Sequence, residues 1–253
     1  MNELALFAGA GGGILGGKLL GWRTVCAVEW EAYPASVLCA RQNDGILPPF
    51  PIWDDVQTFD GKPWRGIVNV ISGGFPCQDL SSAGKGAGLD GARSGLWREM
   101  ARVVSEVRPE FVFVENSPML VTRGLERVIG DLTKIGYDTK WTVMGAGDVG
   151  ANHQRDRIWI VGKTANPFSV RLQKVHEEQG IPPKKKLGFA QQTCPDWASP
   201  NKEWLLGRIP PSLIRVDDAV AARVDRLKAI GNGQVPLCAA TAWRILNAQL
   251  HSN

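Results

Sequence analysis

Short runs of consecutive apolar residues are the feature that most constrains the fold of this 253-residue chain. Residues 67–71 and 111–114 form two such runs. A run without polar alternation is typical of a strand buried on both faces of a parallel sheet. Residues 94–107, between them, have apolar residues at helical spacing. Strands that alternate with helices predict an α/β fold built on a doubly wound, mostly parallel sheet.

A glycine-rich turn follows the first expected strand, residues 3–7. The turn covers residues 8–13, and residues 14–20 are expected to form the next helix. Such a turn lets a ligand approach the backbone, where the N–H groups of the helix face it. It suits nucleotides, flavins and adenosyl cofactors alike, so by itself it is a weak signal.

An acidic residue ends the second expected strand, residues 24–28. Glu29 lies about 20 residues beyond the glycines, which is the place of a carboxylate that binds ribose hydroxyls. Trp30 would then lie against an adenine ring. We favour this interpretation over a surface glutamate and a core tryptophan because the glycine turn is present. Asp55 is a weaker candidate acceptor for an adenine amino group, since loop aspartates are common turn residues.

A cysteine follows two glycines and a proline at the end of the run at residues 67–71. Cys77 is then followed by a loop of small residues, 81–88. This arrangement favours a nucleophilic thiol at the carboxyl end of a strand, backed by a closing loop. A lone cysteine is more often a buried structural residue, so the rest of the chain has to decide.

Charged residues adjoin two further apolar strands. Glu115 ends the run at residues 111–114, where poor solvation should raise its pKa and allow it to act as an acid near neutral pH. Arg155 and Arg157 alternate just before an apolar strand at residues 158–162, so both should point to one face. Two guanidinium groups there would bind a phosphate or an anionic intermediate. In isolation, an ion pair at a strand edge explains them equally well.

Positive charge is concentrated in one segment. The net charge is +4, and residues 163–215 hold nine Lys or Arg against four Asp or Glu. This suits a phosphate backbone as partner, with a solvated face as an equal alternative. We expect a small, irregular basic domain at residues 163–231. The larger domain would comprise residues 1–162 plus 232–253, with the C-terminal helix packed on the sheet.

Cysteine usage and hydropathy indicate the compartment. The five cysteines are scattered, and no pair has zinc-ligand spacing. No apolar run approaches the length needed to span a membrane, and no basic leader precedes the first strand. We therefore expect a cytoplasmic protein with free thiols, no metal and no membrane partner.

The motifs, in their order, resemble those of the cytosine-5 DNA methyltransferases nearly from end to end. FAGAGGG, starting at Phe7, resembles the family's cofactor loop, and GGFPCQ resembles its most specific signature. ENS at residues 115–117 resembles the family's ENV, and HQRDR resembles its QxRxR. RLKAIGNGQVP resembles its last motif. One such motif would be weak, but an ordered set is strong.

The resemblance implies the Rossmann-like fold of class I S-adenosylmethionine-dependent methyltransferases. It implies S-adenosylmethionine as cofactor and double-stranded DNA as partner of a monomer that needs no other protein, in a bacterium or a phage-infected one. The implied catalytic residues are Cys77 as nucleophile and Glu115 as acid, with Arg155 and Arg157. Implied cofactor contacts are Phe7, Gly9, Ala10, Gly11, Gly12, Glu29, Trp30, Asp55, Val56, Gly74, Pro76, Leu96 and Asn232. Implied DNA contacts are Gln78, Ser81, Arg155, Lys184, Lys185 and Lys186.

Four departures from the family pattern leave the thiol and the acid untouched. Ala5 replaces an aspartate, Ser117 a valine, His153 a glutamine and Lys228 a frequent glutamine. Residues 163–207 are short for the segment that reads DNA sequence in this family. The region lacks the Cys-Phe-Thr signature of the tRNA-methylating branch, so DNA is favoured.

Two alternatives remain open. A catalytically silent, S-adenosylmethionine-binding regulator of DNA would need a damaged Cys77 or Glu115, and both are intact. A dinucleotide-binding oxidoreductase shares the glycine turn and the acidic residue, but it does not explain the motifs PCQ, ENS and RDR.

Overall fold

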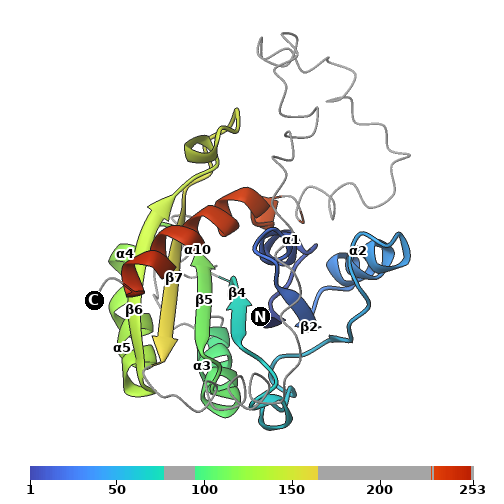
Figure 1. Ribbon diagram of the computed structural model, residues 1–253, viewed down its shortest axis with the longest axis horizontal. Coiled ribbons are helices and arrows are strands. Elements are labelled where there is room, and N and C mark those ends of the chain that lie inside the picture. The colour runs from blue at the N-terminus through green and yellow to red at the C-terminus, as the bar shows by residue number, and fades with distance from the viewer. Residues whose placement is uncertain (77–94, 165–228, 230, 252–253) are drawn as a thin grey trace, which may run out of the picture.

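The computed structural model describes residues 1–76, 95–164, 229 and 231–251. A seven-stranded sheet runs through this part of the chain in the order β3-β2-β1-β4-β5-β7-β6 (Figure 1). The strands are Asn2–Leu6 (β1), Arg23–Val28 (β2), Ile52–Trp53 (β3), Val70–Gly73 (β4), Phe111–Asn116 (β5), Tyr137–Met144 (β6) and Arg157–Thr164 (β7). Neighbours are parallel except where β7 pairs with β5 and β6. The predicted mostly parallel sheet is thus confirmed.

Helices cover both faces of this sheet (Figure 1). One face carries α3 (Gly95–Val107), α4 (Leu120–Arg123) and α5 (Leu125–Lys134). The other carries α1 (Gly12–Leu19), α2 (Ala32–Asn43) and α10 (Pro236–His251). Two short 3₁₀ helices, η1 (Lys62–Trp64) and η3 (Gly147–Val149), complete the described elements. Burial between two helical layers is the reason that the strands read as continuous apolar runs.

Strand β5 shows this arrangement residue by residue. Val112 and Val114 are completely buried against the layer of α3, α4 and α5. Phe111 and Phe113, which alternate with them, pack against Trp243 of α10. The ring of Trp243 meets both phenylalanine rings edge-on. The four residues from Phe111 to Val114 therefore pack against apolar side chains, whichever face they occupy.

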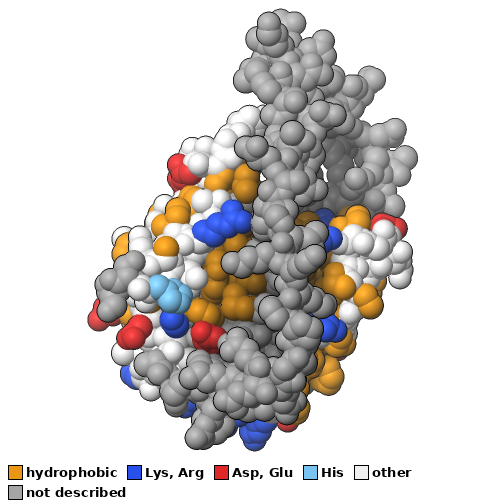
Figure 2. Space-filling view, viewed as in Figure 1, with side chains coloured by type: hydrophobic (Ala, Val, Ile, Leu, Met, Phe, Trp, Pro, Cys, Tyr) orange, Lys and Arg blue, Asp and Glu red, His pale blue; other side chains and the backbone are white. Residues whose placement is uncertain are grey.

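The expected C-terminal helix is confirmed, and it returns to the sheet as predicted. Its inward residues, including Trp243 and Leu246, are buried in the cluster that also holds Val161 of β7. Figure 2 shows hydrophobic side chains gathered on the face of the molecule that carries α10. No helix in the described ranges is both long and apolar enough to cross a membrane.

The strand expected at residues 67–71 lies further along the chain. The observed strand is Val70–Gly73, and Ile67 is 50% exposed before it. Gly73, which follows the expected strand, belongs to the observed one and pairs with Leu6 of β1. A side chain on Gly73 would approach the Leu6 carbonyl oxygen to 2.7 Å, so close backbone packing, rather than a break, requires this glycine.

Other boundaries also differ from the expectation. α2 and β3 have weak apolar patterns, and the sequence did not predict either element. The helical segment at residues 120–134 is divided at Gly124 into α4 and α5. The proposed small domain at residues 163–231 lies almost entirely outside the described residues, so the division into two domains stays a prediction.

The direction of the chain changes at the centre of the sheet. From β1 it passes to α1 on one face, whereas the next described helix after the adjacent strand β4 is α3, on the opposite face. Open α/β sheets bind ligands at such a reversal, outside the carboxyl ends of the strands. The order β2-β1-β4-β5 therefore places a site at the carboxyl ends of β1 and β4.

A buried carboxyl group joins the three central strands. Glu3 of β1 is 0% exposed and accepts hydrogen bonds from the Thr24 hydroxyl of β2 (2.7 Å) and the Ser72 hydroxyl of β4 (2.6 Å). Loss of solvation raises the pKa of Glu3 to about 7, although the two hydroxyl groups oppose the rise. α1 passes directly over this carboxyl group, as shown by the short distance of 3.1 Å that a Cβ atom on Gly17 would have to a Glu3 oxygen.

This carboxyl group should make stability depend on pH. The pKa of Glu3 in the folded chain is raised from 4.5 to about 7. Its contribution is therefore fully present below pH 4.5 and is lost as the pH rises through 7. Between pH 5 and 8, the unfolding free energy of the wild-type protein should fall by up to about 3 kcal/mol relative to Glu3→Gln. Urea unfolding of both proteins tests this, and parallel pH dependences would contradict it.

Candidate functional site

A crevice opens at the carboxyl ends of β1 and β4. Its walls come from these two strand ends, the start of α1, the end of β5 and the segment before α10. The lining residues are 5–9, 13, 14, 72–74, 115 and 232–234. Four predicted cofactor residues, Phe7, Gly9, Gly74 and Asn232, lie among them. The structure thus brings the first and last motifs of the chain together.

The glycine-rich turn takes its shape from left-handed backbone conformations. Gly9 has φ 54° and Gly11 has φ 83°, which glycine adopts without the penalty of a Cβ atom. Phe7 also has a positive φ, 52°, which is unusual for a residue with a side chain. Gly11 immediately precedes α1, and Gly13 in its first turn lines the crevice. The unpaired N–H groups at the start of α1 therefore lie at the crevice wall.

The Glu29 carboxylate fastens this turn to the end of β2. One oxygen accepts a hydrogen bond from the Gly9 N–H (2.7 Å), and the other accepts one from the Glu31 N–H (2.8 Å). Both carboxylate oxygens of Glu29 therefore take part in holding the turn. The ribose-binding role that the sequence assigned to Glu29 stays a prediction, and the sequence missed this structural role.

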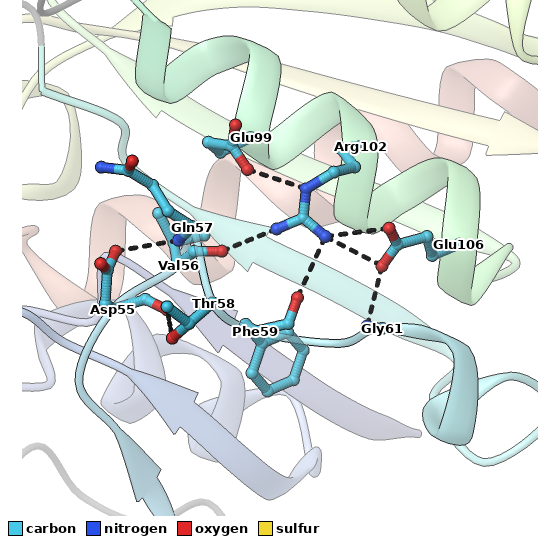
Figure 3. A network of polar contacts seen from close by, with 9 residues as sticks. All are labelled: Asp55, Val56, Gln57, Thr58, Phe59, Gly61, Glu99, Arg102 and Glu106. Carbon is cyan, nitrogen blue, oxygen red and sulfur yellow. Dashed lines mark hydrogen bonds and ion pairs between the residues drawn. The ribbon is translucent and has the colours of Figure 1, made fainter.

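The residues predicted to surround an adenine ring differ in exposure. Trp30 is 73% exposed, so its ring is available to a ligand. Asp55 is half-buried, and its Oδ1 accepts a hydrogen bond from the Gln57 N–H (2.9 Å; Figure 3). Val56 is only 5% exposed and packs in the core, and Leu96 packs at the edge of the same core. Recognition of adenine by these residues stays a prediction.

A buried ion pair lies at the end of β5. Glu115 is 8% exposed, and its Oε1 lies 2.8 Å from Nε of Arg157 at the start of β7. Its other oxygen, Oε2, accepts a longer hydrogen bond from the Gln234 amide (3.4 Å). The two strands are antiparallel neighbours, so their pairing places the two charged groups side by side.

The pKa of Glu115 is raised, as the sequence predicted. Burial is the main cause, because it penalises the ionised carboxylate. The positive charges of Arg157 and Arg155 oppose burial and lower the pKa, and the Gln234 hydrogen bond acts in the same direction. The group can therefore hold a proton beside the crevice, and the adjoining cations limit how tightly it does so.

Two neighbours of Glu115 position the chain that leads to Cys77. A Cβ on Gly74 would lie 2.5 Å from Glu115 Oε2, so this position next to the acid accepts only glycine without movement of the carboxyl group. The Asn116 amide donates a hydrogen bond to the Phe75 carbonyl oxygen (3.1 Å). Asn116 thus fixes the backbone two residues before Cys77.

Arg155 holds the segment that carries the last motif. Its Nη2 donates hydrogen bonds to the carbonyl oxygens of Gly231 and Gly233, the latter at 2.7 Å. These bonds use one of its three nitrogen atoms, so a DNA contact through the others is compatible with them. The positive charges of Arg155 and Arg157 both lower the pKa of Glu115.

Several predicted residues lie outside the described part of the chain. They are Cys77, Gln78, Ser81, Lys184, Lys185 and Lys186, together with the loop at residues 81–88. The nucleophile, the closing loop and the DNA contacts among these residues therefore stay predictions. Pro76 is described, and it directly precedes Cys77.

Sequence reasoning missed Gln234, which joins the two halves of the site. Its side-chain oxygen would lie 2.5 Å from a Cβ on Gly13, and its amide lies beside Glu115. A Cβ on Gly12 would clash with the Gln234 backbone. Two features of the sequence could have pointed to Gln234. They are the adjacent glycines Gly12 and Gly13, which leave room for it, and its position two residues after Asn232.

A family model described as C-5 cytosine-specific DNA methylase matches residues 1–204. Type II methyltransferase M.CviJI of Paramecium bursaria Chlorella virus IL3A is 33% identical over 182 residues, which are 71% of this chain and 45% of that protein. This chain therefore spans less than half the length of that relative.

Solved structures give a consistent result. A DNA modification methyltransferase encoded within an Escherichia coli prophage is 26% identical, with a TM-score of 0.50 over 65% of this chain and 47% of that one. Spodoptera frugiperda DNMT2 is 19% identical, with a TM-score of 0.52 over 65% of this chain and 50% of that one. The second likeness concerns the fold alone. The fold is that of the class I methyltransferases, as predicted.

The ion pair at Glu115 leads to a prediction about its titration. Arg157→Gln removes the nearest positive charge, which lowers the pKa of Glu115, so this pKa should rise further in the variant. Arg157→Lys keeps the charge and is the matched control, with a smaller rise expected. Infrared difference spectra of the carboxyl stretch across a pH titration measure the change. An unchanged Glu115 titration in Arg157→Gln would refute the assigned electrostatic role.

Proposed function

The chain belongs to the C-5 cytosine-specific DNA methylase family, and from this premise we propose that it methylates carbon 5 of cytosine in double-stranded DNA. The methyl donor would be S-adenosylmethionine. The observation that carries the proposal is the convergence of distant segments on one crevice. It is lined by the turn after β1, the start of α1, the end of β4, the Glu115 end of β5 and residues 232–234, and Arg157 at the start of β7 pairs with Glu115.

The residues around the crevice suit the cofactor. The start of α1 offers N–H groups to a carboxylate, and Glu29 offers acceptor capacity to ribose hydroxyls. Trp30 offers an exposed aromatic face to adenine, and Asp55 offers an acceptor to its amino group. S-adenosylmethionine supplies the electrophilic methyl group that carbon 5 of the cytosine accepts.

Cytosine carbon 5 is a poor nucleophile until the ring is activated. The Cys77 thiolate would add to carbon 6 and give carbon 5 enamine character. Glu115, which burial keeps protonated to higher pH, would donate a proton to ring nitrogen 3 as negative charge develops there. Arg157 would hold the Glu115 carboxyl group in place. Once carbon 5 carries the methyl group, a base removes the carbon 5 proton, the nitrogen 3 proton returns to Glu115 and the thiolate leaves.

The substrate base must leave the double helix to reach this crevice. A cytosine stacked in DNA is inaccessible, and flipping it out costs a few kcal/mol. We propose that Gln78, Ser81 and the Lys184–Lys186 run contact the DNA, the lysines through salt-dependent backbone contacts. We further propose a monomer that acts in the cytoplasm of a bacterium or a phage-infected bacterium.

Transfer of labelled methyl groups to unmethylated plasmid DNA tests the proposal. Label at cytosine carbon 5, located by bisulfite sequencing, is the expected product. Cys77→Ser should lower the transfer rate by about 1,000-fold or more, while calorimetric binding of S-adenosylmethionine is retained. Cys39→Ser, at an exposed cysteine of α2, is the matched control and should leave transfer unchanged.

Other outcomes would revise the proposal. Unchanged turnover of Cys77→Ser would rule out the covalent scheme. Cofactor binding without any transfer by the wild-type protein would favour a catalytically silent regulator of DNA.

A further inference from the structure

A single arginine of α3 holds the loop that carries the candidate adenine contacts. This loop, residues 55–61, follows β3 and begins with Asp55 and Val56. Figure 3 shows the Arg102 guanidinium group pointing from α3 into the loop, between two glutamates of the same helix. The mechanism proposed above assigns no role to Arg102.

The contacts of Arg102 are made to loop backbone. Its Nη2 donates to the Val56 carbonyl oxygen (2.7 Å), and its Nη1 donates to the Phe59 carbonyl oxygen (3.0 Å). A planar guanidinium group can hold two such acceptors at a fixed separation, which an ammonium group cannot do. The bonds therefore set the path of the loop, whatever side chains it carries.

Two glutamates hold the guanidinium group in this orientation. Glu99 lies 2.8 Å from Nε, and both oxygens of Glu106 lie within 3.0 Å of Nη1. Partial burial alone would lower the pKa of Arg102, but these carboxylates raise it overall. Glu106 also accepts a hydrogen bond from the Gly61 N–H (2.8 Å), so the far end of the loop is held by the same cluster.

The helix that carries the cluster is itself firmly placed. Trp97, Met100, Val103, Val104 and Val107 form its buried face. Within the loop, the Asp55 carboxylate accepts a hydrogen bond from the Gln57 N–H (2.9 Å), and the Asp55 carbonyl oxygen accepts one from the Thr58 hydroxyl group (3.0 Å). The direction of the Asp55 carboxylate is thus set by a tight turn, and Arg102 binds that turn at both sides.

We propose that Arg102 is a positioning residue for adenine recognition, acting through the loop to aim the Asp55 carboxylate at the 6-amino group of the cofactor. The inference rests on the proposed function, because it takes the crevice as an S-adenosylmethionine site. It adds a residue outside the crevice that affects which cofactor base the site prefers. An isolated ion pair on a helix surface would contribute little, whereas bonds to loop carbonyls constrain the loop itself.

Binding of two ligands that differ only at the base measures this role. S-adenosylhomocysteine carries the amino group, and S-inosylhomocysteine carries an oxygen in its place. Calorimetry with the wild-type protein should show about tenfold tighter binding of the adenosyl compound, because Asp55 accepts from an amino group and opposes a carbonyl oxygen. In Arg102→Lys this ratio should fall towards one, mainly through weaker adenosyl binding.

Matched variants separate positioning from general damage. Arg98→Lys changes an exposed arginine of the same helix that makes no hydrogen bond to the loop in the described residues, so it should keep the wild-type ratio. Glu106→Gln keeps the arginine but weakens its support, so it should lower the ratio partly. Thermal melting checks that each variant is folded.

The possible results point to different conclusions. An unchanged ratio in Arg102→Lys, or equal weakening of both ligands, would overturn the role of Arg102 and leave the cofactor site standing. A wild-type protein that binds both ligands equally would also overturn it, since Asp55 would then not read the base. A wild-type protein that binds neither ligand would instead refute the cofactor assignment of the proposed function.

Discussion

β1 and β4 lie side by side at the centre of the sheet, yet they are followed by helices on opposite faces, and the site depends on this divergence. The helices that follow the two strands cannot cover the same edge, so the carboxyl ends remain open between them. The glycine turn after β1 and the Gly73-Gly74 end of β4 then form two walls of one crevice. Gly73 permits the close approach of the two strands.

Burial gives the charged groups near this crevice their chemical character. Glu115 and Glu3 both lie among apolar strands, and loss of solvation raises the pKa of each. Their partners differ, however. Glu115 faces a guanidinium group and an amide, whereas Glu3 has two neutral hydroxyl groups, and in both cases these partners oppose the rise. One carboxyl group is thus available for chemistry at the crevice, and the other joins the strands beneath it.

Backbone contacts by charged side chains recur around the site. Glu29 binds the glycine turn, Arg155 binds the segment at residues 231–233 and Arg102 binds the loop at residues 55–61. In each case a charged group holds a loop through its N–H or carbonyl groups. Charge-assisted hydrogen bonds are stronger than neutral ones, so a few of them can order loops that have little apolar surface.

The sequence by itself determined the class of fold and the order of the motifs, and it singled out Glu29, Glu115 and Arg157 as candidate site residues. Strand burial and turn chemistry depend on short stretches of sequence, so they can be predicted locally. It did not predict α2 or β3, whose weak patterns depend on packing against α1 and β2. Only the tertiary structure decided that Gln234 lies beside Glu115 and that Arg102 donates a hydrogen bond to the Val56 carbonyl oxygen. Those pairs are separated by 119 and 46 positions in the chain. Such contacts arise from strand order and helix placement, and no local pattern specifies them.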